Sequence, residues 1–187
     1  MSDSGGSPRH VLIGICGGIA AYKMATVVSR LVQRGDRVTV AMTASATRFI
    51  GAQTFEALSG RPVLTEAWTV IDAPASQHVA LAADADALLI APCTMHTLAR
   101  LVQGFADDAV TLLAAAVDRS TTPVLVAPAM NDVMYRQPAV QRNVQQLRAD
   151  GFTIIEPVEG WQSCRTQGKG RLPEPEALLK ALDASHA

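Results

Sequence analysis

The chain has 187 residues, of which 49% are hydrophobic and 18% charged; this suits one folded domain with a sizeable core and argues against disorder. The 16 Lys and Arg residues against 17 Asp and Glu residues give a formal net charge of −1, and aromatic residues make up only 4%. The chain therefore lacks the basic excess and the aromatic platforms that would favour nucleic acid or an anionic membrane surface as its main partner.

The chain ends and the cysteines indicate a cytoplasmic, single-domain protein. Residues 1–8 are rich in Ser and Gly and lack the charged-then-apolar pattern of a signal peptide, so we expect a flexible tail before one domain over residues 9–187. No apolar stretch approaches the roughly 20 residues of a membrane-spanning helix. Cys16, Cys93 and Cys164 form an odd, widely spaced set, which argues against a disulfide scaffold and favours a reducing compartment.

Short apolar runs alternate with segments of helical periodicity along the chain. The predicted strands are His10–Cys16, Arg37–Met42, Ala85–Ala91, Pro123–Ala127 and Phe152–Ile155. The predicted helices are Ile19–Leu31, Thr43–Phe49, Gln53–Leu58, Thr94–Gln103, Ala109–Val117, Pro138–Asp150 and Pro173–Ala184, and the Gly-rich segment Pro157–Leu172 is predicted to be a loop. Apolar strands that alternate with helices are typical of a doubly wound, Rossmann-like α/β domain, a parallel sheet with helices on both faces.

In such folds ligands bind at the carboxyl ends of the strands, so the residues after each strand are the candidate site. Gly17–Ala20 lies between the first strand and its helix. Glycine lets the backbone approach a ligand and a helix start attracts anions, so a phosphate site is one interpretation, and a tight turn without a ligand is the other. The spacing does not match the G-x-G-x-x-G fingerprint, and no Walker lysine pattern is present.

Hydroxyl side chains follow the second and third strands. Thr43 and Ser45 could bind a phosphate or a ribityl chain, but capping of the next helix is the favoured interpretation from the residues alone. In the segment Pro92–Thr97, both Thr94 and Thr97 are also candidates for helix caps.

The segment Pro128–Tyr135 follows the fourth strand and has an unusual composition. The amide of Asn131 could hydrogen-bond a carboxylate or a flavin edge. The alternative, favoured by the residues alone, is that Asn131 caps a helix while Met130 and Met134 pack in the core.

Three further observations are weaker. His78 stands alone in its stretch, and a lone histidine is more often structural or at the surface than catalytic. The adjacent carboxylates Asp107 and Asp108 are best explained as favourable charges at a helix start. No group of His and Cys residues has metal-ligand spacing, so no metal site is predicted.

Taken together and in order, these segments resemble the homo-oligomeric flavin-containing cysteine decarboxylases, from about residue 10 to residue 175. The most specific match is P-A-M-N-x-x-M-Y at 128–135, and G-G-I-A-A-Y-K at 17–23 also agrees. His78-x-x-Leu81 stands where the family keeps its active-site histidine, and Gly104-x-Ala106-Asp107-Asp108 matches its G-x-A-D-[DN] element. Ser163-Cys164 with Gly168-x-Gly170-Arg171 resembles the segment that clamps the substrate.

The chain departs from the family pattern at two places. The flavin-contacting segment P-A-[ST]-A-N-[T] reads P-C-T-M-H-T at 92–97, which retains the hydroxyls of Thr94 and Thr97. The clamp, usually A-C-G-D, reads S-C-R-T at 163–166. We therefore expect flavin binding to be retained, whereas the altered clamp bears on the identity of the substrate.

The resemblance implies a flavoprotein-type α/β domain that binds FMN. The residues expected to contact FMN are Gly17, Gly18, Ile19, Ala20, Thr43, Ser45, Pro92, Cys93, Thr94 and Thr97. By the same resemblance, His78 is the active-site base or orients the substrate thiol, Asn131 holds the substrate carboxylate and Cys164 donates a proton. Met130 and Met134 are expected to line the substrate pocket together with Asn131 and Cys164.

Within the family, the closest resemblance is to the branch that converts 4′-phosphopantothenoylcysteine to 4′-phosphopantetheine in coenzyme A biosynthesis. That chemistry runs through oxidation of the thiol to a thioaldehyde, loss of CO₂ and re-reduction. The resemblance also implies a homotrimer, or a homododecamer built from trimers, with the flavin at subunit contacts. The ligase domain that bacterial relatives often carry after this one is not expected in this chain.

Two alternatives stay open. One is an oxidative decarboxylase of a C-terminal peptidyl-cysteine, which stops at the enethiol and needs no reduction step. The other is a flavoprotein subunit without activity. The presence of Cys164 favours the coenzyme A reaction over the first, and the retention of His78, Asn131 and Cys164 argues against the second.

Overall fold

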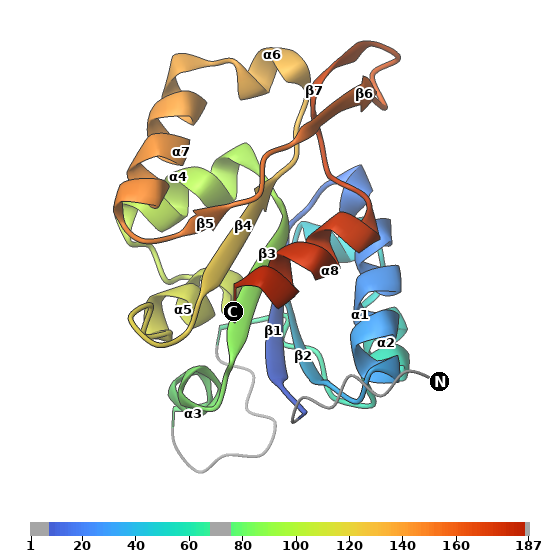
Figure 1. Ribbon diagram of the computed structural model, residues 1–187, viewed down its shortest axis with the longest axis vertical. Coiled ribbons are helices and arrows are strands. Elements are labelled where there is room, and N and C mark those ends of the chain that lie inside the picture. The colour runs from blue at the N-terminus through green and yellow to red at the C-terminus, as the bar shows by residue number, and fades with distance from the viewer. Residues whose placement is uncertain (1–7, 68–75, 186–187) are drawn as a thin grey trace.

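Five parallel strands in the order β2-β1-β3-β4-β5 form the centre of the computed structural model, which describes residues 8–67 and 76–185 (Figure 1). The strands are β1 (His10–Ile15), β2 (Arg37–Met42), β3 (Ala87–Cys93), β4 (Val124–Pro128) and β5 (Thr153–Ile154). Strand order reverses between β1 and β3, as in a doubly wound sheet, so the predicted fold class is confirmed. The predicted N-terminal tail falls almost wholly on residues 1–7, which lie outside the described residues.

Helices cover both faces of this sheet (Figure 1). The first face carries α1 (Lys23–Gln33), α2 (Ala52–Ser59) and α8 (Pro175–Ala184). The second carries α3 (Gln77–Ala83), α4 (Met95–Gln103), α5 (Ala109–Ala116) and α7 (Pro138–Ala149). Short helical turns are η1 (Ile19–Tyr22), η2 (Ala46–Arg48) and α6 (Asp132–Tyr135). In the part of the chain that the structure describes, no helix combines the length and the apolar character needed to cross a membrane.

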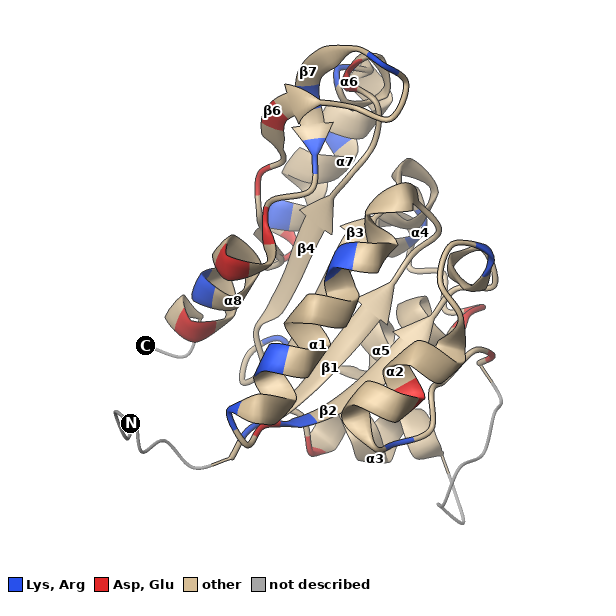
Figure 2. Cartoon of the chain, turned by 90° about the vertical axis from the view of Figure 1, so that its right-hand side faces the viewer, with Lys and Arg blue, Asp and Glu red and all other residues tan. Residues whose placement is uncertain are grey.

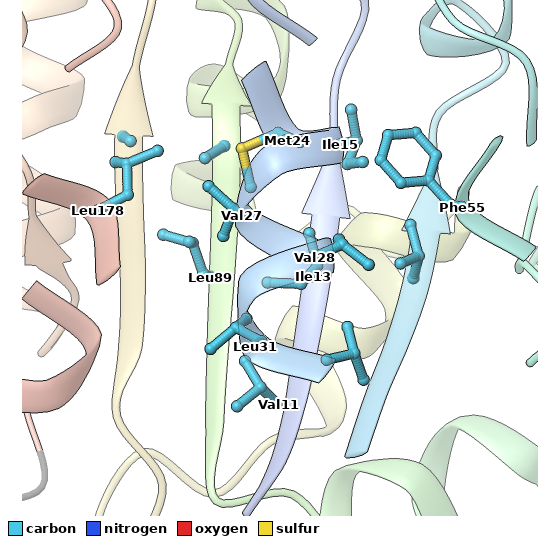
Figure 3. Packing of buried hydrophobic residues seen from close by; sticks show 14 of the residues in the cluster. Val11, Ile13, Ile15, Met24, Val27, Val28, Leu31, Phe55, Leu89 and Leu178 are labelled. Carbon is cyan, nitrogen blue, oxygen red and sulfur yellow. The ribbon is translucent and has the colours of Figure 1, made fainter. Parts of the chain in front are cut away.

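Alternate residues of each strand serve opposite faces. Val11, Ile13 and Ile15 of β1 pack against α1 in the first apolar cluster (Figure 3), whereas Leu12 belongs to the second cluster. Every residue of β1, β3 and β4 is buried. This double burial explains why the strands read as continuous apolar runs in the sequence rather than as alternating patterns.

Most predicted helices lie where the structure has a helix, but their bounds or helix type differ. The segment predicted as one helix over Ile19–Leu31 is a 3₁₀ turn, η1, followed by α1, and Gly35 behind it takes the left-handed backbone conformation (φ 91°) expected of a stop signal. The amphipathic helix predicted over Pro138–Asp150 is α7, with its apolar face buried. Helix α3 was not predicted.

The prediction of a loop over Pro157–Leu172 was wrong. The segment is an antiparallel hairpin, β6 (Val158–Trp161) and β7 (Gln167–Arg171), which forms a separate two-stranded sheet. Most of its side chains are exposed and it has glycines at three positions, so it carries no apolar alternation from which a strand could be recognised. We refer to residues 158–171 as the hairpin.

Ion pairs align the last helix with the first. Figure 2 shows basic positions along α1 and acidic positions along α8. Arg30 pairs with Glu176 at 2.6 Å and Arg34 with Asp183 at 3.2 Å. Exposed pairs of this kind each contribute little to stability, but together with the apolar contacts of α8 they fix where the chain runs after the hairpin.

Candidate active site

A cavity of about 450 Å³ opens at the carboxyl ends of β1, β3 and β4. This is where ligands bind in open α/β sheets, and the volume lies within the range of small-molecule sites. The cavity is lined by Gly17, Gly18, Ile19, Ala20, Tyr22, Lys23, Pro92, Thr94, Met95, Ala129, Met130, Asn131, Met134, Trp161, Gln162, Ser163, Cys164, Gly170, Arg171 and Leu172.

The turn Gly17–Ala20 forms one end of this cavity. A Cβ on Gly17 would lie 2.4 Å from the Cβ of Ser45, so only glycine fits there, whereas Gly18 has open space around it. The first hydrogen bond of η1 runs from the Ala21 amide to the Gly18 carbonyl at 3.0 Å. The amides of Gly18, Ile19 and Ala20 precede that bond and border the cavity, which makes the turn a cradle for an anion such as a phosphate.

Of the hydroxyl residues that follow the second and third strands, only Thr94 lines the cavity. Thr43 is buried, and its Oγ1 accepts a hydrogen bond from the Ala46 amide at 3.3 Å, whereas the N-cap of η2 is Ser45, whose side chain makes no capping bond. Ser45 is exposed and packs directly against Gly17. Thr94 lines the cavity and caps α4, with its Oγ1 3.3 Å from the Thr97 amide, while Thr97 itself is buried. None of Thr43, Ser45 and Thr97 is among the residues that line the cavity.

Cys16 and Cys93 are both buried beneath the strand ends, and Cys93 does not line the cavity either. Burial raises the pKa of Cys93 well above its ordinary value, so this thiol stays protonated. Among residues 8–67 and 76–185, no cluster of three or more His, Cys, Asp or Glu side chains is placed to hold a metal ion.

Asn131 begins the short helix α6 at the end of β4. Its Oδ1 accepts a hydrogen bond from the Val133 amide at 2.8 Å, so the capping interpretation is correct. The cap uses only the oxygen and leaves Nδ2 directed at the cavity wall. The accompanying expectation of core packing was wrong for Met134, which is 42% exposed on the cavity wall, whereas Met130 packs against the second apolar cluster and also lines the cavity.

The hairpin closes the cavity from the other side. The Met130 amide donates to the Gly170 carbonyl at 2.9 Å, which fastens β7 to the end of β4. A Cβ on Gly170 would lie 2.3 Å from the Met130 carbonyl oxygen, and one on Gly168 would lie 2.6 Å from the Asp132 Cβ. These glycines allow a close approach that brings Trp161 and Cys164 to the cavity wall.

Cys164 lies in the turn at the tip of the hairpin. Gln162 and Thr166 close this turn through a backbone hydrogen bond of 2.8 Å, and Arg165 within it has a left-handed backbone (φ 65°). The Cys164 Sγ lies 2.9 Å from the Thr166 hydroxyl and 3.0 Å from Asn131 Nδ2. Hydrogen bonds from Thr166 and then from Asn131 lower the pKa of the Cys164 thiol, because they stabilise its thiolate.

Lys23 is a site residue that sequence reasoning missed. It is only 6% exposed, and its Nζ donates to the Leu172 carbonyl and to Glu174 Oε1, both at 3.0 Å. These bonds tie the start of α1 to the chain that leaves the hairpin. A lysine is normally expected at the surface, and its place in the G-G-I-A-A-Y-K segment was the only signal that could have found it.

His78 does not meet the other predicted catalytic residues within this chain. It lies on α3 and lines a separate hollow of about 20 Å³ with Leu64, Glu66 and Leu113 among its neighbours. The large cavity joins Asn131 and Cys164, the other two predicted catalytic residues.

Comparisons with known proteins agree with this geometry. The bifunctional coenzyme A biosynthesis protein CoaBC of Bacillus subtilis is 44% identical over 96% of this chain. A solved structure of a PPC decarboxylase mutant complexed with pantothenoylaminoethenethiol covers 95% of this chain and 98% of its own, with 26% identity and a TM-score of 0.85. The FMN-dependent cysteine decarboxylase SpaF is 34% identical, covers 94% of this chain and 98% of its own, and has a TM-score of 0.76.

The chain spans less than half of the curated relative, since the match covers 43% of the Bacillus protein. It spans nearly all of both solved chains. The family model described as flavoprotein matches residues 2–186, almost the whole sequence. The chain therefore belongs to the flavoprotein family.

Proposed function

We propose that this chain is an FMN-dependent decarboxylase that converts 4′-phosphopantothenoylcysteine to 4′-phosphopantetheine in coenzyme A biosynthesis. The observation that carries the proposal is the pairing of Asn131 Nδ2 with Cys164 Sγ at 3.0 Å on the wall of the strand-end cavity. The similarity to CoaBC over 96% of the chain and the likeness to the PPC decarboxylase structure support the choice of substrate.

The cavity fits FMN. The open amides at Gly18–Ala20 suit its phosphate, and the exposed hydroxyl of Ser45 lies beside that turn. The apolar side chains on the wall, which suit an aromatic ring system, are Ile19, Met95, Met130, Met134 and Trp161. Bound FMN would supply the reversible two-electron oxidation of the substrate's cysteine thiol to a thioaldehyde, from which CO₂ leaves readily.

Two residues of the chain then have separate tasks. Asn131 Nδ2 is a neutral group that contacts Gln162 and Cys164 in this chain, and it can turn one N–H to the substrate carboxylate, which orients the carboxylate without stabilising its charge against loss of CO₂. Its Oδ1 is already used by the helix cap, so the amide presents only its nitrogen to the cavity. Cys164 is placed beside it to donate a proton when the enethiolate is reduced to the saturated product.

Cys164 also separates this proposal from the second candidate, an oxidative decarboxylase of a C-terminal peptidyl-cysteine. That reaction ends at the enethiol and requires no proton donor for a reduction. The specific feature that keeps it as a candidate is the clamp, where Arg165 and Thr166 replace the glycine and aspartate of the usual pattern.

The test is mass spectrometry of the purified holoenzyme with 4′-phosphopantothenoylcysteine, after its flavin absorption has been recorded. We expect a product lighter by one CO₂. Cys164→Ser should still release CO₂ but accumulate a product that lacks two hydrogens, because the reduction has lost its proton donor. A flavin-containing enzyme that leaves this compound unchanged and decarboxylates peptides ending in cysteine would replace the proposal with the second candidate.

We further propose that a second copy of the chain completes the site with His78, in a homotrimer or a larger assembly of trimers. His78 lies outside the large cavity of its own chain, while Ile19 and Tyr22 at the cavity and Val79 beside His78 are each more than half exposed. Apolar side chains at the surface favour contact with another protein surface. The cytoplasmic location expected from the sequence stays a prediction.

Subunit complementation tests this assembly. His78→Asn and Asn131→Asp should each abolish turnover, the second because its carboxylate repels the substrate carboxylate. If the two residues act from different subunits, co-expression of both variants should restore part of the activity, because some mixed sites carry neither change. Two inactive variants that stay inactive when mixed, in an assembly proven to contain both, would place His78 and Asn131 in the same subunit's site or outside catalysis.

A further inference from the structure

Gln162 is a buried amide in an otherwise exposed turn. It follows β6 directly and is 7% exposed, whereas Trp161, Ser163, Cys164 and Arg165 around it are exposed. A buried amide is costly unless its oxygen and nitrogen both find partners, and in this molecule both do. Its partners are therefore informative about its task.

The oxygen of Gln162 collects bonds from the residues of the active site. Oε1 accepts from the Asp132 amide at 3.1 Å and from Asn131 Nδ2 at 3.3 Å, and it lies 3.7 Å from the Cys164 thiol, which can donate to it. Its Nε2 donates to the Gly168 carbonyl across the hairpin at 3.5 Å. One side chain thus touches both residues assigned to the carboxylate and the proton.

These contacts determine the orientation of the Asn131 amide. Its oxygen is held by the Val133 amide, one hydrogen of Nδ2 is directed to Gln162 and the other to Cys164 Sγ at 3.0 Å. Without the Gln162 oxygen, the Nδ2 end would lose one of its two partners. The bond from Nδ2 to the sulfur would then no longer be fixed in direction.

We propose that Gln162 is a positioning residue, which holds Asn131 Nδ2 and Cys164 Sγ in contact for the protonation step of the decarboxylase reaction. The proposal rests on the function proposed above. It differs from a purely structural role, in which Gln162 would merely fasten the hairpin to α6. In that case, removal of its side chain would slow every step of the reaction equally.

The ionisation of Cys164 offers a readout that does not need a substrate. Its thiolate accepts hydrogen bonds from Thr166 and from Asn131. The nearest charged residues along the chain are Arg165, next to Cys164 in the turn, and Asp132, which follows Asn131 and is paired with Arg136. Across the cavity, Lys23 and Arg171 are both paired with Glu174. Loss of the Asn131 hydrogen bond removes a donor from the thiolate, so the pKa of Cys164 should rise.

The experiment compares Gln162→Met with Gln167→Met, the same change at an exposed position of the same hairpin. Iodoacetamide alkylation of Cys164 in the holoenzyme is followed by mass spectrometry as a function of pH. We expect its midpoint to move to higher pH in Gln162→Met and to stay in place in Gln167→Met. With 4′-phosphopantothenoylcysteine, the ratio of reduced product to unreduced enethiol should fall about tenfold in Gln162→Met alone, the effect of losing one hydrogen bond to an ionised group.

Unchanged alkylation and an unchanged product ratio in Gln162→Met would overturn the proposal. So would a uniform loss of turnover with no shift of the alkylation midpoint, because that is the result of a fastening role. Since alkylation needs no substrate, it decides the positioning role even if the wild-type enzyme fails to convert the coenzyme A precursor, which would refute only the proposed function.

A second variant serves if Gln162→Met does not retain its flavin. Gln162→Glu keeps an acceptor for Asn131 and for the Asp132 amide, but it places a negative charge beside the sulfur. The midpoint should therefore move to higher pH in this variant too. A midpoint that stays at the wild-type value would show that the side chain at position 162 does not act on Cys164.

Discussion

The end of the parallel sheet and the hairpin form opposite walls of one cavity but are held in opposite ways. The sheet strands β1, β3 and β4 are buried throughout, between two apolar clusters on the two faces. In the hairpin, only Gln162 and Gly170 are buried. Its attachment consists of polar contacts, chiefly the bond between Met130 and Gly170 and those of Gln162.

This difference makes the end of the sheet the fixed wall of the cavity and the hairpin the wall that can open. Regions with few buried apolar contacts open at a small fraction of the global unfolding free energy, while strands in the core open only with the whole domain. The turn Gly17–Ala20, which is proposed to hold FMN, stands on the fixed wall, and Cys164 stands on the other. We therefore expect substrate exchange to involve movement of the hairpin while the flavin side stays in place.

The largest expected effect is a loss of stability from a substitution in the fixed wall. Leu89 of β3 is fully buried in the first cluster (Figure 3), and Leu89→Ala should reduce the free energy of unfolding by about 3 kcal/mol. Trp161→Ala, on the hairpin and 67% exposed, should change it by less than about 0.5 kcal/mol. Urea unfolding of both variants measures the contrast. Equal losses would mean that the hairpin contributes to global stability as much as the core does.

A smaller effect on stability but a clear effect on activity is expected at Gly170. In Gly170→Ala the Cβ meets the Met130 carbonyl at 2.3 Å, and the backbone there has φ 149°, so the hairpin should detach from β4. Hydrogen exchange should become faster at the hairpin amides and at Met130, stay unchanged in β1 and β3, and turnover should fall more than about tenfold.

The control for this variant is Gly51→Ala, where the nearest atom to the new Cβ is the tip of the Gln53 side chain at 3.2 Å and the backbone has φ −69°. That change should leave both exchange and turnover as in the wild type. Faster exchange in the strands β1 and β3 of Gly170→Ala would contradict the separation of the two walls.

The smallest expected effect is at Arg165. Its left-handed backbone costs a non-glycine residue about 1 kcal/mol, part of which Arg165→Gly should recover. Hydrogen exchange at the amides of the hairpin turn should slow by up to about fivefold, with no change in the midpoint of global unfolding. Arg165→Ala removes the same side chain but keeps the strain, and it should exchange like the wild type. Slower exchange in that control would attribute the effect to the arginine side chain.

The sequence predicted the fixed wall of the cavity far better than the hairpin wall. Strands such as His10–Cys16, observed as His10–Ile15, could be recognised because burial on both faces requires a continuous apolar run. The caps Thr94 and Asn131 were also predictable, since capping depends on residues a few positions apart. Asp108, expected only as a favourable charge at a helix start, also caps its helix.

The hairpin and its contacts could not be found in the same way. Its strands are held by glycines that approach Met130 and Asp132, residues more than thirty positions earlier in the chain. Gln162 and Lys23 are polar residues whose burial depends on such distant partners, namely Asn131 and Glu174. Local periodicity contains no information about contacts of this kind, and resemblance to known proteins indicated Cys164 but not Gln162.

The ion pair between Lys23 and Glu174 has a consequence for the order of events during synthesis. A ribosome releases the chain from its N-terminus, so the turn at Gly17–Ala20 and the end of β4 emerge before the hairpin does. A nascent chain at that stage can present the cradle for the flavin phosphate with one wall of the cavity still missing. Lys23 gains its carboxylate partner only after Glu174 has left the ribosome, so the cavity closes late in synthesis, when only α8 is still to join the first apolar cluster.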